Sequence, residues 1–73
     1  MTATPADDAT SFEIAFLDDA GSPAHIEPIV GTQPAKRRWD AVAKNVRSGG
    51  YIPEIRRAEF RQNGAVLKVA IPA

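Results

Sequence analysis

Cysteine is absent from this chain of 73 residues, and aromatic residues make up only 7% of it. The lack of cysteine excludes a disulfide framework and a thiolate metal site, and it favours a reducing compartment over secretion. No stretch approaches the ~20 consecutive apolar residues of a membrane-spanning helix. Residues 1–8 lack the basic and apolar stretches of a signal peptide. These absences predict a soluble protein of the cytoplasm with a small hydrophobic core.

The length predicts one domain, because a chain this short buries only roughly 60% of the surface that its unfolded form exposes. Its first ten residues are Thr, Ala, Pro and Asp, with no large hydrophobic residue after Met1. Burial cannot offset the entropy of ordering such a segment. We therefore expect a mobile acidic tail over residues 1–10 and a single folded domain over residues 11–73.

Two strands are expected before the middle of the chain. A half-buried strand beginning at residue 11 is indicated by the alternation of three large apolar residues, Phe12, Ile14 and Phe16. Turn-forming residues over 18–23 end this strand. Residues 24–30 form a weaker strand candidate. Pro28 has no N–H to donate to a ladder, so this second segment is predicted to be an edge strand or an extended loop.

A helix is predicted over about residues 34–48. Thr32 or Gln33 is expected to cap it, and Pro34 suits the first turn because its missing N–H costs nothing there. Gly49-Gly50 supplies the left-handed conformation that ends a helix. The apolar residues recur at the spacing of one helical face, and they are Trp39, Val42, Ala43 and Val46.

Asn63-Gly64 predicts a tight two-residue hairpin, because both positions of the preferred turn adopt positive φ. The two strands are expected at roughly 54–62 and 65–71, with a bulge or a strand end near Ile55 and Arg56. A regular register out from the turn gives three favourable cross-strand pairs: Phe60 with Leu67, Ala58 with Val69, and Glu59 with Lys68.

These elements predict an α+β domain in which one helix packs on an antiparallel sheet that includes a C-terminal β-hairpin. The core is expected to come from the apolar faces of the strands and the helix. Its predicted members are Phe12, Ile14, Phe16, Trp39, Val42, Val46, Phe60, Leu67, Val69 and Ile71.

No constellation for catalysis, cofactor binding or metal binding is predicted. His25 is the only histidine, so it lacks both a second ligand and a nucleophile, and we expect an exposed or loosely hydrogen-bonded side chain. Residues 18–22 resemble the start of a calcium loop, but the twelfth position holds Ile29 where a bidentate Glu is needed. Gly49-Gly50 follows a helix, whereas phosphate loops precede one. We therefore expect a protein that is not an enzyme.

The charges are divided between the two halves of the chain. Residues 1–35 contain six acids and no Lys or Arg, whereas residues 36–73 contain nine Lys and Arg against three acids, so the halves carry −6 and +6. Such a division indicates an interaction surface, or it is neutralised when the two halves pack together. Within the helix, Asp40 is spaced for ion pairs with Lys36 and Lys44.

The exposed contact surface predicted from these charges is basic, with an acidic arm as a secondary contact. Its residues are Lys36, Arg37, Arg38, Arg56, Arg57 and Arg61, together with Asp7 and Asp8. A protein partner is favoured, and the free protein is expected to be a monomer. Nucleic acid is the alternative, but the pI of 6.5 is well below the value of about 9 expected for a dedicated binder. Membership of another complex, or self-association of the acidic half with the basic half, also stays open.

In length, in its strand–helix–hairpin plan and in its charged ends, the chain resembles the small proteins with which phages redirect their hosts. Among these it resembles the Xanthomonas phage inhibitor and antiterminator of host RNA polymerase. The resemblance implies binding to the β′ amino-terminal region and the β flap of bacterial RNA polymerase, in the host cytoplasm. That binding would hinder promoter-specific initiation and promote read-through of terminators.

Overall fold

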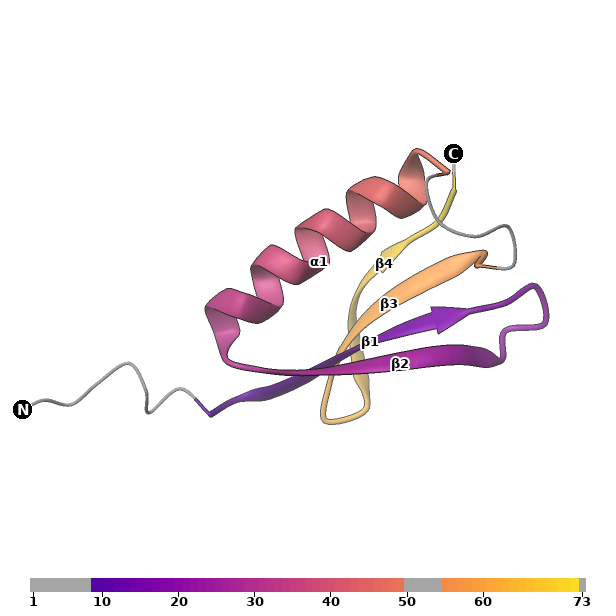
Figure 1. Cartoon of the computed structure of the whole chain (residues 1–73). Coiled ribbons are helices and arrows are strands. Elements are labelled where there is room, and N and C mark those ends of the chain that lie inside the picture. Colours follow the sequence, from indigo (N-terminus) through magenta and orange to yellow (C-terminus); the bar gives the residue numbers. More distant parts are fainter. Residues whose placement is uncertain (1–8, 50–54, 73) are drawn as a thin grey trace, which may run out of the picture.

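The structure is a computed structural model that describes residues 9–49 and 55–72. Figure 1 shows one helix lying across one face of a sheet. The elements in chain order are β1 (Ser11–Leu17), β2 (Pro23–Val30), α1 (Thr32–Arg47), β3 (Arg57–Gln62) and β4 (Ala65–Ala70). The strands lie in the order β2-β1-β3-β4, and each pair of neighbours is antiparallel. The predicted α+β domain is therefore confirmed. Residues 1–8 of the predicted tail lie outside the described residues.

The first hairpin follows its sequence pattern closely. β1 begins at the predicted residue, and β2 is an edge strand, which confirms one of the two alternatives for that segment. The Asp18 carboxylate shapes the connecting turn, since Oδ1 accepts hydrogen bonds from the backbone N–H of Ala20 and of Ser22, both at 2.9 Å. A short side chain that binds the backbone two to four residues on is a common way to fix such a turn.

The helix begins at Thr32, two residues earlier than predicted, and Gly31 is its N-cap. Neither Thr32 nor Gln33 is the N-cap, so that prediction was wrong, and no side chain hydrogen bonds as a cap. The reason is the backbone of Gly31, whose φ of 101° turns the chain directly from β2 into α1. Its N–H donates to the Thr10 carbonyl at 2.8 Å, which ties the turn to the start of β1. Gly49, at φ 75°, follows the helix end as expected, while Gly50 lies outside the described residues.

The second hairpin has the predicted turn but not the predicted register. Asn63 and Gly64 both have positive φ, and the first two pairs beyond them are regular. A register shift then occurs between Phe60 and Arg61, so that Leu67 is an extra residue in β4. Beyond the shift the partners are Phe60 with Lys68, Glu59 with Val69, and Ala58 with Ala70. The three predicted pairs, Phe60–Leu67, Ala58–Val69 and Glu59–Lys68, were therefore wrong.

The physical reason lies in the composition of β4. Residues 65–71 are apolar at every position except Lys68, so no alternation of polar and apolar side chains opposes a slip by one residue. The slip places the small Ala70 beside the buried Ala58 on the helix side of the sheet. β3 begins at Arg57, which confirms the strand end predicted near Ile55 and Arg56 as one of two alternatives, while Glu54 lies outside the described residues. β4 ends at Ala70, one residue earlier than predicted.

The core lies between α1 and the sheet, and an aromatic stack runs through it. The Phe60 ring stacks on Phe12 at 5.1 Å and on Trp39 at 5.6 Å between ring centroids. The predicted core members that are buried are Ile14, Phe16, Trp39, Val42, Val46 and Phe60, with Phe12 partly buried against them. Small residues and Ile55 fill the remaining positions: Ala35, Ala43, Ala58 and Ala70.

Three predicted core residues are exposed instead. The exposed fractions are 49% for Leu67, 39% for Val69 and 57% for Ile71. All three belong to β4 or directly follow it, at the edge of the sheet, where the register shift turns Val69 to the same side as Glu59. The core is therefore built on β1, β3 and α1, and the outer surface of β4 is left apolar.

Candidate functional site

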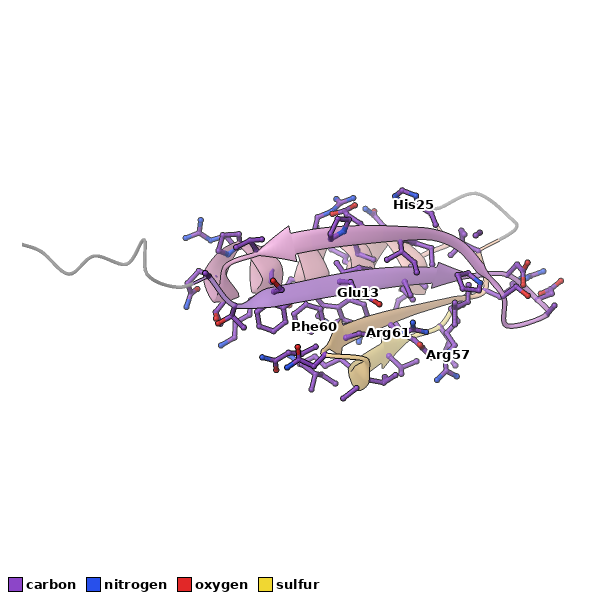
Figure 2. All side chains as sticks on the ribbon, turned by 90° about the horizontal axis from the view of Figure 1, so that it is seen from below. Glu13, His25, Arg57, Phe60 and Arg61 are labelled. Atoms are coloured by element: carbon purple, nitrogen blue, oxygen red, sulfur yellow. The ribbon has the colours of Figure 1, made fainter. Side chains whose placement is uncertain are left out.

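The sheet face opposite α1 has no described helix over it, and it carries a row of charges along its middle strands. The pairing of β1 with β3 places Glu13 beside Arg61, Ala15 beside Glu59 and Leu17 beside Arg57. Figure 2 views this face, with Glu13, Arg57 and Arg61 in front of the sheet. Ala15 is nonetheless fully buried and Leu17 is only 5% exposed. The long charged side chains of this face therefore shield the apolar residues beneath them.

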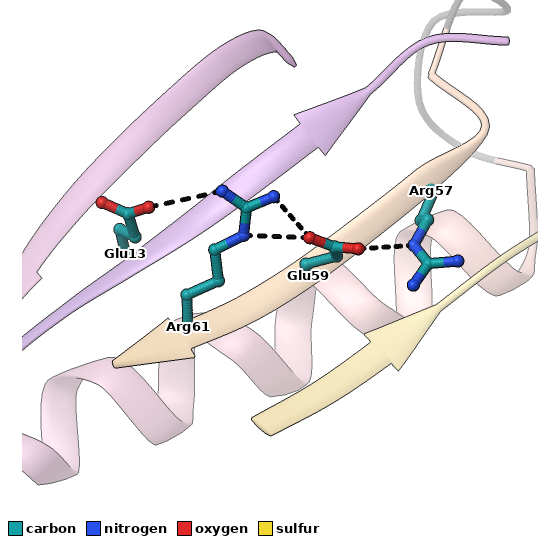
Figure 3. A network of polar contacts seen from close by, with 4 residues as sticks. All are labelled: Glu13, Arg57, Glu59 and Arg61. Carbon is teal, nitrogen blue, oxygen red and sulfur yellow. Dashed lines mark hydrogen bonds and ion pairs between the residues drawn. The ribbon is translucent and has the colours of Figure 1, made fainter. Parts of the chain in front are cut away.

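Glu59 is at the centre of this row (Figure 3). The Arg57 Nε donates to Glu59 Oε2 at 2.7 Å, and the Arg61 Nε donates to Glu59 Oε1 at 2.9 Å. Arg61 also approaches Glu13, with Nη1 3.6 Å from Oε2. Burial of the Glu59 carboxyl favours its neutral form, but the hydrogen bonds from Arg61 and Arg57 outweigh this and hold the pKa of Glu59 below its ordinary value of 4.5.

Two further ion pairs join the acidic half of the chain to the basic half. Arg38 on α1 binds Glu27 on β2 through two hydrogen bonds, from Nε to Oε2 at 2.7 Å and from Nη2 to Oε1 at 3.0 Å. The hydrogen bond from Arg38 is the main reason that the pKa of Glu27 lies below its ordinary value. Arg56 lies 3.0 Å from an Asp19 carboxylate oxygen at the exposed end of the first hairpin.

These contacts show that much of the charge division is neutralised within the fold. Four of the six cations in the predicted contact set are held in ion pairs: Arg38, Arg56, Arg57 and Arg61. Conversely, the ion pairs that the sequence assigns to Asp40 are not formed among residues 9–49 and 55–72. Of the two alternatives that the charge division leaves open, neutralisation between the packed halves therefore holds for Arg38, Arg56 and Arg61.

The exposed cations that remain on α1 form a surface that we call the basic helix face. Its cations are Lys36, Arg37, Lys44 and Arg47, and the exposed Asp40 lies among them. None of these four cations is in an ion pair with another described residue. Arg37 and Lys44 are seven residues apart, which is two helical turns, so they project from the same outward side. The remaining predicted contacts, Asp7 and Asp8, lie outside the described residues.

A second surface is the free edge of β4, where the sequence prediction had placed Leu67 and Val69 in the core. Val66, Leu67 and Val69 are 47%, 49% and 39% exposed. Of the described elements, only β3 and α1 contact this strand. The signal that could have found it is the missing polar alternation in residues 65–71, since one exposed face normally carries polar side chains.

The sequence also offers His25 and Trp39 as candidates for chemistry or stacking. His25 is exposed, as predicted, and its ring lies 5.8 Å from the Phe16 ring. Trp39 is 3% exposed within the core stack, so its indole is not available for stacking on a ligand. Within the part of the chain that the structure describes, no group of three or more His, Cys, Asp or Glu side chains is placed to hold a metal ion. No described helix has both the length and the apolar character needed to cross a membrane.

Comparisons of the chain with protein-family models, with curated proteins and with solved structures give no match.

Proposed function

We propose that this chain is a non-catalytic protein-binding regulator that uses the basic helix face to contact an acidic surface of its partner. The observation that carries the proposal is the contrast between two sets of cations. Lys36, Arg37, Lys44 and Arg47 are exposed without an ion-pair partner among the described residues, whereas Arg38, Arg56, Arg57 and Arg61 are engaged within the fold. Cations already held by carboxylates would have to give up those contacts before binding elsewhere.

The contact set proposed here is therefore narrower than the one predicted from the sequence. Lys36 and Arg37 stay in it, and Lys44 and Arg47 join them from the same helix. Complementary charge would raise the rate and the specificity of association, so binding should weaken as salt screens it. The resemblance to phage regulators names the partner to test first, which is bacterial RNA polymerase. On that version the protein acts in the bacterial cytoplasm as an inhibitor of initiation and an antiterminator.

Affinity capture from a bacterial lysate tests the proposal. The double variant Arg37→Gln, Lys44→Gln removes two charges from the basic helix face. The matched control, Arg56→Gln, Lys68→Gln, removes two charges elsewhere. We expect the wild type and the control to recover the β and β′ subunits of the polymerase, and the helix variant to lose them. Recovery of no polymerase subunit by the wild type would overturn the polymerase version. Equal recovery by both variants would overturn the role of the helix face.

Direct binding of nucleic acid is the second candidate, because the same four cations span three turns of one helix. It predicts that log affinity falls with log salt by about 0.9 per phosphate contact on duplex DNA. The burial of Trp39 removes one of the two aromatic residues that could stack on bases, and the other, Tyr51, lies outside the described residues. A gel-shift assay at low salt separates the candidates, since the protein-binding proposal expects no shift.

A further inference from the structure

The two edges of the sheet differ in how well they are protected from pairing with another strand. β2 contains Pro23 and Pro28, which cannot donate to a neighbouring strand, and it carries Glu27 between them. Prolines and charges of this kind are common protections of an edge. β4 contains no proline, a single charge at Lys68, and three apolar side chains that are 39–49% exposed. An unprotected edge with exposed apolar side chains is suited to pairing with a further strand.

The sequence of β4 indicates which strand that is, because it is nearly the same read in either direction. Its residues are Ala65-Val66-Leu67-Lys68-Val69-Ala70. We propose that β4 pairs antiparallel with β4 of a second copy of this chain, about a twofold axis between Leu67 and Lys68. In a twofold contact, if residue i of one copy lies opposite residue j of the other, then residue j also lies opposite residue i. Ala65 then lies opposite Ala70 of the second copy, and Val66 lies opposite Val69 of the second copy.

The placement of side chains on the two faces of the sheet agrees with this register. Val66 pairs with Arg61 and Val69 pairs with Glu59, so both valines belong to the face opposite α1. A twofold axis perpendicular to the sheet keeps each face on its own side, so the valine pairs meet on one surface. Cross-strand pairs of β-branched residues stabilise a sheet. Leu67 is an extra residue in both copies, so the two strands have the same irregularity. The pairs of Val66 with Val69 and of Ala65 with Ala70 can therefore form on both sides of the axis in one register.

The same register also separates the like charges. Lys68 is the only charge on the strand, and it lies opposite Leu67 of the second copy instead of opposite the other Lys68. Its aliphatic stem can cover that leucine while the ammonium group stays in water. The dimer that results has one antiparallel sheet of eight strands, with both helices on one side. This inference rests on β4 and not on the proposed function. Its consequence for that function is that two basic helix faces point the same way and can bind a partner together.

Sedimentation equilibrium tests the proposal on the full chain, at concentrations from about 10 to about 500 µM, since a contact limited to one strand from each copy is small. We expect a monomer–dimer equilibrium that persists at ~1 M NaCl, where the Debye length is only ~3 Å. A dimer formed by the acidic half and the basic half would dissociate under that screening. A wild type that stays monomeric over the whole range, or a dimer that salt dissociates, would overturn the proposal.

Two substitutions at one position test the register. Leu67→Lys places a lysine opposite Lys68 of the other copy at both symmetric positions of the dimer. Leu67→Glu places an opposite charge at the same two positions and removes the same apolar group. We expect the dimer dissociation constant of L67K to exceed that of L67E by about tenfold. Ile26→Lys on the other edge strand, at a side chain that is 40% exposed, should leave the wild-type constant unchanged. Far-UV circular dichroism confirms that each variant is folded. Equal constants for L67K and L67E would overturn this register.

Discussion

The hairpin of β1 with β2 and the hairpin of β3 with β4 each place one strand inside the sheet and one strand at its edge. Their inner strands are alike, since both supply aromatic residues to the core and charged residues to the opposite face. Their outer strands differ. Both strands expose apolar side chains, Ile26 and Val30 on β2 and Val66, Leu67 and Val69 on β4, but β2 also carries two prolines and an ion pair to α1, which β4 lacks.

The two edges therefore differ in how readily their backbone can pair with a further strand. Pro28 lies opposite Glu13 on β1, and because proline has no N–H, this position cannot donate to a strand on its free side. β2 therefore ends the sheet. β4 has no proline, and the residue that it contributes to the core is Ala70. Its larger apolar side chains are exposed. The added strand proposed above would cover the apolar side chains that β4 exposes.

The largest expected effect is on the free energy of unfolding, and it differs between the inner strand β3 and the edge strand β4 of the second hairpin. Phe60→Ala should lower the free energy of unfolding by about 3–5 kcal/mol, because it removes a buried ring that stacks on two others. Leu67→Ala, at a side chain that is 49% exposed, should cost under about 1 kcal/mol. Urea unfolding of dilute protein, where association adds nothing, measures both. Similar losses would show that β4 belongs to the core.

An intermediate effect is expected from the carboxylates that each hairpin uses for ion pairs. Glu59→Gln should cost about 1–3 kcal/mol, because two arginines lose a carboxylate that is 7% exposed. The matched change Glu27→Gln affects a more exposed pair with Arg38, and should cost under about 1 kcal/mol. Urea unfolding at neutral pH gives both values. A larger loss for Glu27→Gln would reverse the ranking of the two pairs.

The same two carboxyls give the stability a pH dependence of known sign. The pKa values of Glu59 and Glu27 in the folded chain lie below the ordinary value of 4.5, so the folded state binds protons less readily than the unfolded state. Their contribution is complete above pH 4.5 and is lost as the pH falls through the lowered values. Unfolding curves over that acid range should show a weaker pH dependence for Glu59→Gln than for the wild type. An unchanged pH dependence would contradict this.

The smallest expected effect comes from removing the protection of β2. Pro28→Val restores an N–H on the free edge, and it should lower the free energy of unfolding by under about 1 kcal/mol, through the greater freedom of the unfolded chain. In a Leu67→Lys background, which weakens pairing at β4, the substitution should produce a new association through β2 in sedimentation equilibrium. Continued absence of association would mean that proline is not what protects this edge.

Much of the local structure could be predicted, because short-range backbone chemistry determines it. The alternation in β1, the Asp18 turn, the apolar stripe of α1 and the Asn63-Gly64 turn each specify a conformation within a few residues. The helix start was misplaced because Gly31 acts through an unusual φ and through a hydrogen bond to Thr10, on a distant segment. Of the predicted contact cations, Lys36 and Arg37 are exposed without an ion pair to another described residue, whereas the other four form ion pairs within the fold. The contact set itself stays a prediction.

The sequence alone determined which segments become strands, helix and turns, and it determined the charge of each half of the chain. Only the tertiary structure decided how those halves meet, because the ion pairs of Glu13 with Arg61 and of Asp19 with Arg56 join residues that are far apart in the chain. It also decided the register of β4. In a strand that is apolar on both faces, a slip by one residue buries no polar side chain, so the side-chain pattern does not oppose it. Packing beneath α1 therefore decides the register: it places Ala70 in the core and leaves Val66, Leu67 and Val69 at the surface.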